Sequence, residues 1–128
     1  MVSEPVRAVA AQKLAKAKEF MLVAEAAMDA MDASVSLAVS AAINAADVIS
    51  LVDAGSYSRD NDHQQAVTRL RRTRPQSARQ LASVLVLKPK AQYDSKRCTK
   101  NDVATALKQS GRLIDLADEL LKKGSGTE

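Results

Sequence analysis

The sequence predicts an all-α protein, a single bundle of four to five helices, and three observations lead to this prediction. Hydrophobic residues make up 46% of the 128 residues, which is enough for one buried core. Aromatic residues make up only 2%, and the chain has only four Gly and three Pro. A sandwich or barrel of short strands needs more turn residues and more aromatic or β-branched packing, so that class is excluded. Apolar residues also recur every three or four positions, which is the period of a buried helix face.

The first helix is predicted from Pro5 to about Met31. Ser3 suits the position just before it, and Pro5 lacks a backbone N–H that would have no partner in the first turn. The apolar stripe consists of Val6, Ala10, Leu14, Ala17, Met21, Ala24, Met28 and Met31.

The second helix is predicted from about Ala33 to Val52. It is unusually rich in Ala and Ser, so a neighbouring helix can approach it closely. Gly55 follows it and is the candidate for the positive φ that ends many helices. The inward face consists of Val35, Val39, Ala42, Ala46, Ile49 and Val52.

Two shorter helices are expected next. Asp60 or Asn61 is the candidate N-cap of a third helix that continues through Leu70 and ends at a Pro-containing break. Ser77 opens a fourth helix, and Pro89 falls near its end, where it kinks or stops the helix. The expected inward positions of this fourth helix are Leu81, Val84, Leu85 and Leu87.

The last helix begins at a cap provided by Thr99 or Asn101 and ends at a pair of Lys residues, where the helix dipole favours positive charge. The whole chain is expected to form one domain, residues 1–123, with a flexible tail, 124–128. The stripe of the last helix consists of Val103, Ala106, Leu107, Ser110, Leu113, Ile114, Ala117, Leu120 and Leu121.

A single Cys and a single His exclude several classes of site. One chain cannot build a closed zinc cluster or an internal disulfide, and the usual Gly-rich phosphate loops are missing, so we expect no metal and no cofactor. Cys98 lies among residues that do not mark an activated thiol. The N-terminal residues do not resemble a signal peptide, and no apolar run approaches the ~20 residues that span a bilayer. We therefore expect a cytoplasmic protein that is not in a membrane.

The charges of the chain are divided between two stretches of opposite sign. Residues 19–62 contain eight acidic residues and one basic residue, and residues 69–100 contain ten basic residues and one acidic residue. One interpretation is that the two stretches attract each other within the fold or between two chains, with the remainder solvated. The other is that the basic stretch attracts phosphate chains.

The residues best suited to catalysis are Arg59, Asp60, Asp62 and His63, at the start of the third helix. Imidazole moves protons near neutral pH, and the guanidinium fork stabilises charge on phosphate. These groups suffice for metal-independent RNA cleavage if a second chain supplies the second His across a two-fold axis. The structural alternative is that His63 caps the helix and Arg59 pairs with Asp60 or Asp62.

Two long stretches of the chain resemble the HEPN domain, and together they span most of it, from Val6 to Leu121. They read AAINAADVISLVDAGSYSRDNDHQQAVTRLRR and ASVLVLKPKAQYDSKRCTKNDVATALKQSGRLIDLADELL. The shared features are Ala-Ala-Asp at Ala45, Ala46 and Asp47, the turn at Gly55, the Arg59 to His63 segment, Lys90-Ala91-Gln92-Tyr93, and a last helix that starts at Asn101-Asp102-Val103-Ala104.

The resemblance implies a bundle built on two long antiparallel helices, commonly a homodimer. Many members are ribonucleases that use an Arg and a His with roughly four to six residues between them, and a polar residue directly follows the Arg. Arg59, Asp60 and His63 fit these positions, although only three residues separate the Arg from the His here. Members paired with a small nucleotidyltransferase act as toxins or their relatives, and other members are inactive binding or assembly modules.

The leading hypothesis is an HEPN-type endoribonuclease, related to toxins or phage defence, that acts on RNA such as tRNA. In this hypothesis His63 is the acid or base, Arg59 stabilises the phosphate and Asp62 orients or tunes them. Two alternatives remain open: a helical interaction module without enzymatic activity, and an RNA- or nucleotide-binding module without turnover. The candidate RNA-binding residues are Arg69, Arg71, Arg72, Arg74 and Lys90, and the candidate ligand contacts are Tyr57 and Tyr93.

Overall fold

The computed structural model describes residues 2–57 and 63–125, and in these residues it confirms the predicted all-α bundle. Five of the helices have eleven residues or more, and α5 is a single short turn. The helices are α1 (Glu4–Ala26), α2 (Met31–Ala54), α3 (His63–Thr73), α4 (Pro75–Leu85), α5 (Lys88–Gln92) and α6 (Lys100–Ser125).

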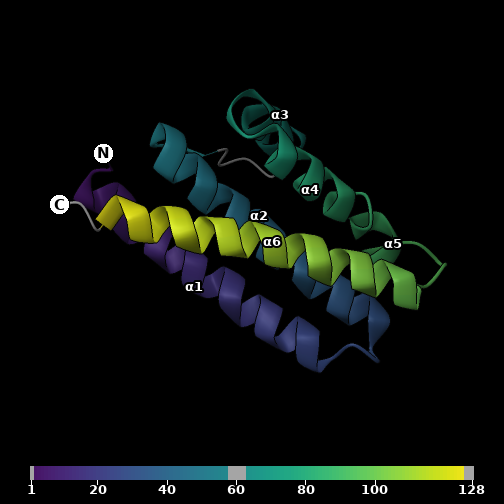
Figure 1. Cartoon of the computed structure of the whole chain (residues 1–128). Helices are drawn as coiled ribbons and strands as arrows, with labels where there is room; N and C mark the ends of the chain where they lie inside the picture. The colour runs from purple at the N-terminus through teal and green to yellow at the C-terminus, as the bar shows by residue number, and fades with distance from the viewer. Residues whose placement is uncertain (1, 58–62, 126–128) are drawn as a thin grey trace.

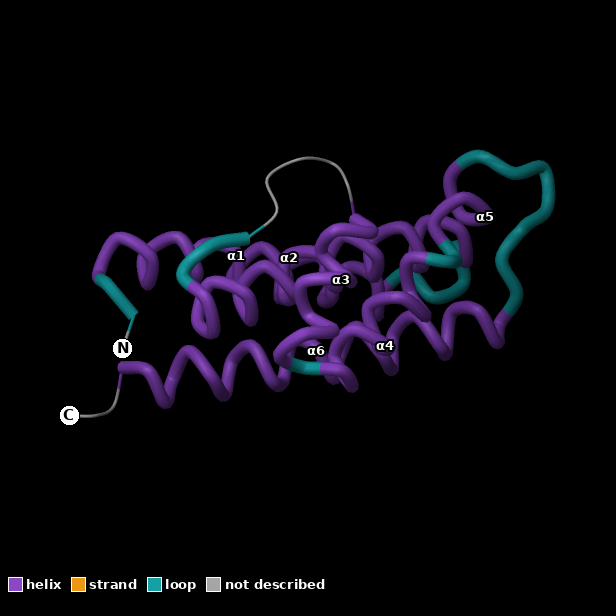
Figure 2. The backbone as a smooth tube through the Cα atoms, turned by 90° about the horizontal axis from the view of Figure 1, so that it is seen from above, coloured by secondary structure: helices purple, strands orange, loops and turns teal. Residues whose placement is uncertain are grey.

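Helix α2 is the centre of the bundle and packs against each of the other five helices. Helices α1 and α2 form a long antiparallel pair, and α6 runs along both (Figure 1). Helices α3, α4 and α5 continue the bundle beside α2 and α6, and the view from above shows α4 next to α6 (Figure 2). Helix α1 begins at the end of the bundle where α6 finishes.

Helix α1 begins as predicted but ends five residues earlier. The Ser3 hydroxyl accepts a hydrogen bond from the Val6 N–H at 3.4 Å, and a Pro stands in the first turn. The prediction that the helix reaches Met31 is wrong, because it ends at Ala26 and the Met28 side chain is 49% exposed. The residues of this turn are good helix formers, so the packing of α1 on α2 sets the boundary, not local propensity.

Helix α2 is buried on nearly every side, and its small residues explain why. Six of its twelve buried residues are Ala or Ser, which let the surrounding helices approach closely. By length and composition α2 could cross a membrane, but 61% of its most apolar window is buried inside the bundle, as expected for a core helix. It extends two residues beyond each predicted end, from Met31 to Ala54, and Gly55 has the predicted positive φ, 76°.

Helix α6 begins with a reciprocal cap. The Thr99 hydroxyl accepts from the Asp102 N–H at 3.1 Å, and the Asp102 carboxylate accepts from the Thr99 N–H at 2.9 Å. The predicted stripe faces the core, with Leu113 completely buried. The helix continues to Ser125, and so includes the first two residues of the stretch predicted as a tail. Residues 126–128 lie outside the described part of the chain.

The shorter helices differ from their predicted bounds. Helix α4 begins at Pro75, because Pro is well suited to a first turn, and Ser77 is buried inside the helix. It ends at Leu85, before Pro89 is reached, and Pro89 belongs to the first turn of α5. The proposed caps of α3, Asp60 and Asn61, lie outside the described residues.

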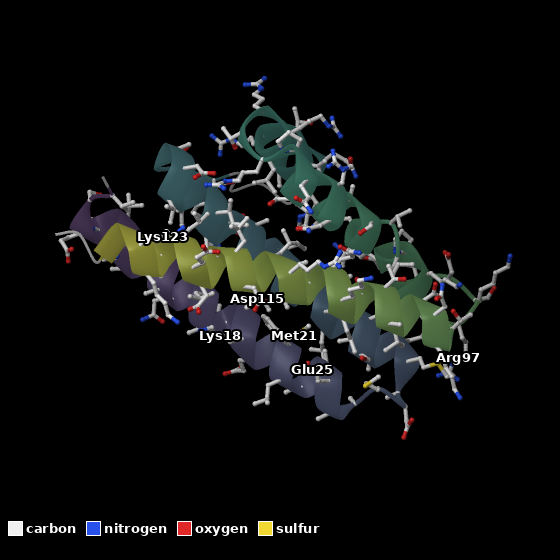
Figure 3. All side chains as sticks on the ribbon, viewed as in Figure 1. Lys18, Met21, Glu25, Arg97, Asp115 and Lys123 are labelled. Atoms are coloured by element: carbon white, nitrogen blue, oxygen red, sulfur yellow. The ribbon has the colours of Figure 1, made fainter. Side chains whose placement is uncertain are left out.

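Several side-chain contacts join neighbouring helices at the surface of the bundle. Lys18 of α1 donates to Asp118 of α6 at 3.0 Å, and Met21 lies against α6 beside Gly111 (Figure 3). Arg97 lies at the end of the bundle where α6 starts and pairs with Asp32 of α2 at 3.3 Å (Figure 3).

Candidate functional site

Of the three predicted catalytic residues, the structure describes only His63. It is the first residue of α3, and its side chain is partly exposed. Arg59 and Asp62 lie outside the described residues, as does Asp60, so the geometry of the Arg-to-His segment is not described.

A buried carboxylate, Asp47 of α2, interacts with the charge of His63. Only 8% of Asp47 is exposed, and Lys13 of α1 donates to its Oδ2 at 2.9 Å. Burial raises the pKa of Asp47, and it outweighs the hydrogen bond and charge of Lys13 and the positive charge of His63, which act to lower it. The carboxylate therefore pairs with a lysine from α1, and the charge of the imidazole at the start of α3 also acts on it.

Tyr57, a predicted ligand contact, belongs to the same group of residues. The Lys13 ammonium lies 4.2 Å from the centroid of the Tyr57 ring, within the range of a cation–π interaction. We call Lys13, Asp47, Tyr57 and His63 the Asp47 cluster. A cavity of about 410 Å³ opens beside it and is lined by Ala8, Val9, Gln12, Lys13, Lys16 and Tyr57.

The sequence analysis did not select Lys13 or assign a site role to Asp47. A signal for Asp47 was present, because it is a charged residue within the long apolar run of α2 and is flanked by Ala46 and Val48. A buried charge is costly unless it is paired, so an acid in that position predicts a partner from another helix. Periodicity alone does not identify Lys13, which is 34 residues away.

The five predicted RNA-binding cations differ in the partners that they have within the fold. Arg74 makes two hydrogen bonds to Asp53, at 2.9 and 3.1 Å, and Arg69 donates to the Ser56 hydroxyl at 3.0 Å. Lys90 pairs with Asp102 at 2.8 Å, next to the start of α6. Arg74 and Lys90 therefore hold elements of the fold together.

Arg71 and Arg72 differ from the other predicted cations. Both are exposed in the last turn of α3, and neither makes a hydrogen bond or ion pair within residues 2–57 and 63–125. Among the described residues, two pairs join the acidic and basic stretches of the sequence, Arg74 with Asp53 and Arg97 with Asp32. These pairs agree with attraction between the two stretches within the fold, and the attraction of phosphate chains by the basic stretch stays a prediction.

The remaining candidate side chains, Tyr93 and Cys98, offer little catalytic chemistry. Tyr93 is 72% exposed. Cys98 is buried, and burial together with its hydrogen bond to Asp32 raises the pKa of its thiol to about 11, which is unfavourable for a nucleophile. Within the part of the chain that the structure describes, no three His, Cys, Asp or Glu side chains gather in a way that could hold a metal ion.

No family model, curated protein or solved structure matches the chain.

Proposed function

We propose that this chain is a metal-independent endoribonuclease of the HEPN type that acts on RNA in the cytoplasm as a homodimer. The observation that carries the proposal is the position of His63. The imidazole opens α3 and is partly exposed to solvent, and its positive charge acts on the buried Asp47 carboxylate. An imidazole near a carboxylate is oriented by it and kept available for proton transfer.

The proposed reaction needs two proton transfers. One imidazole removes the proton from a ribose 2′-hydroxyl, and the 2′-oxygen attacks the adjacent phosphorus. The bond from phosphorus to the 5′-oxygen breaks as a second imidazole donates a proton to that oxygen. The products carry a 2′,3′-cyclic phosphate and a 5′-hydroxyl. Because each chain has one His, the second imidazole comes from a second copy related by a two-fold axis.

The other groups have supporting roles in this proposal. Arg59 neutralises the charge that develops on the phosphate. Asp62 orients or tunes the side chains of Arg59 and His63. Asp47 is a positioning residue, and Lys13 acts to lower its pKa against the effect of burial. Tyr57, which lies under the Lys13 ammonium, contacts the ligand from the side of the 410 Å³ cavity.

The test is cleavage of a tRNA pool in EDTA by the wild-type protein and by His63→Ala, with the product ends analysed. We expect cleavage by the wild type that leaves 2′,3′-cyclic phosphates, and loss of at least about a hundredfold in rate in the variant. Gln64→Ala, in the next position of the same helix turn, is the matched control and retains activity. Cleavage by His63→Ala at the wild-type rate, with an unchanged helical circular dichroism signal, refutes the proposal.

Arg71 and Arg72 favour a second candidate, an RNA-binding module without turnover. Two neighbouring exposed guanidinium groups that have no ion-pair partner among the described residues suit a phosphate chain. This candidate predicts RNA binding that weakens steeply with salt while the RNA stays intact.

A further inference from the structure

A second groove, lined only by polar residues, lies between α4 and α6. It has a volume of about 250 Å³, and helices α4 and α6 pack side by side along it. None of its lining residues is acidic or aromatic. The lining residues are Gln76, Arg79, Gln80, Ser83, Gln109 and Arg112. We call it the Arg79–Arg112 groove.

The two arginines of this groove are not neutralised by the fold. Arg79 and Arg112 are exposed, and neither makes a hydrogen bond or ion pair within the described part of the chain. The next acidic residue along α6 is Asp115, which is exposed and does not line the groove. Asp118 and Glu119 follow it, and they pair with Lys122 at 2.9 Å and Lys123 at 3.0 Å. Arg74 and Arg97, by contrast, each have a carboxylate partner.

This arrangement of side chains suits a phosphate group. Two guanidinium forks from facing helices can each bind two oxygens of one anion, and the neighbouring side-chain amides of Gln76 and Gln109 can donate further hydrogen bonds. The lack of an aromatic side chain in the lining gives a base no surface on which to stack. The groove is therefore suited to a backbone phosphate and not to a nucleobase.

We propose that the Arg79–Arg112 groove binds phosphate groups of the RNA backbone, and the choice of RNA as their source rests on the proposed function. Its lining belongs to α4 and α6, whereas the Asp47 cluster belongs to α1, α2 and the start of α3 with the preceding Tyr57. An RNA that contacts both regions is held at two separate places on the surface. The groove then contributes to affinity and not to bond cleavage.

The test compares the full chain with Arg79→Gln/Arg112→Gln by fluorescence anisotropy of an RNA hairpin across a range of salt concentrations. We expect binding to weaken by about tenfold or more, and the slope of log K against log salt to fall by about 2. Lys122→Gln/Lys123→Gln is the matched control. It removes the same charge from two exposed cations that already pair with Asp118 and Glu119 on α6.

Two further arms separate the explanations. Arg79→Lys/Arg112→Lys keeps the charge but loses the fork, so we expect affinity between that of the wild type and that of the Gln variant. Calorimetric titration with pyrophosphate tests for a source other than RNA. If the wild type binds pyrophosphate through these arginines but does not bind RNA, the choice of RNA and the proposed function are both wrong. Equal weakening by the Gln variant and its control, or binding of neither probe, overturns the groove as a phosphate site.

Discussion

Replacing Lys13 by Met removes the only described ion-pair partner of a buried carboxylate, and its effect on stability depends on pH. Asp47 has an 11% exposed side chain and Lys13 a 20% exposed one, so water replaces the lost partner poorly. In the variant the Asp47 carboxyl either stays charged without a partner or takes up a proton. Either outcome is costly at neutral pH, whereas at acid pH protonation costs almost nothing.

The size of the destabilisation follows from these two outcomes, an unpaired buried charge or a protonated carboxyl. Protonating a carboxyl with an ordinary pKa of about 3.9 at pH 7 costs about 4 kcal/mol, which is an upper limit. Removing one partner of a buried pair costs about 3–5 kcal/mol, and Lys13 is not fully buried, so we expect about 2–3 kcal/mol at pH 7. At pH 4 we expect less than about 1 kcal/mol, mainly from the lost contact with Tyr57.

The direction of this pH dependence agrees with the raised pKa of Asp47 in the wild type. Burial raises this pKa, so the folded state holds the proton more tightly than the unfolded state. The contribution of Asp47 to stability is therefore most favourable at low pH and is lost as the pH rises through its folded-state pKa. Lys13→Met raises the pKa of Asp47 further, and it therefore enlarges the loss of stability as the pH rises.

The assay is urea unfolding followed by circular dichroism at pH 4 and pH 7, which gives the free energy of unfolding at each pH. Lys18→Met is the matched control on α1, because Lys18 is 52% exposed and its pair with Asp118 contributes less than about 1 kcal/mol. The double variant Lys13→Met/Asp47→Asn is expected to lose the extra pH dependence. A destabilisation by Lys13→Met that is the same at both pH values would refute this reasoning.

Two further predictions concern the start of α6. The Lys90 ammonium, together with the Thr99 N–H, lowers the pKa of Asp102, so its stabilising effect is present above about pH 4 and is lost as the pH falls through the folded-state pKa. Thermal unfolding of Asp102→Asn should accordingly show a flatter pH dependence between pH 2 and 5 than the wild type, and an identical dependence contradicts this role. Burial raises the pKa of the Cys98 thiol to about 11, so iodoacetamide should alkylate the folded protein at pH 8 far more slowly than the urea-unfolded chain, and equal rates argue against burial.

The features of the fold that depend on local signals were predictable from the sequence. Ser3 starts α1, Gly55 ends α2, and Thr99 caps α6, because each residue satisfies a backbone group or a backbone angle in its own vicinity. The end of α1 was not predictable, since nothing like Gly or Pro marks Ala26, and Ala30 precedes α2 without a side-chain cap.

The candidate sites were predictable only in part, for the same physical reason. His63 stands out in the sequence as the only His, but its proximity to Asp47 depends on how α3 meets α2. Arg79 and Arg112 are 33 residues apart and belong to different helices, so only their packing creates the groove. The partner of Arg74 was also not predictable, because its charge indicated RNA binding and gave no sign of the pair with Asp53 of α2.

Two buried hydroxyl groups prevent the long helices from sliding along one another. Ser34 donates to the Ala24 carbonyl oxygen at 2.7 Å, and Ser110 of α6 donates to the Ala38 carbonyl oxygen at 2.8 Å. A shift of one turn would strand both donors in an apolar interior, at a cost of about 1–3 kcal/mol each. We therefore expect amide hydrogen exchange to be slower in the three long helices than in α3, α4 and α5, where ligand binding is expected to cause more movement.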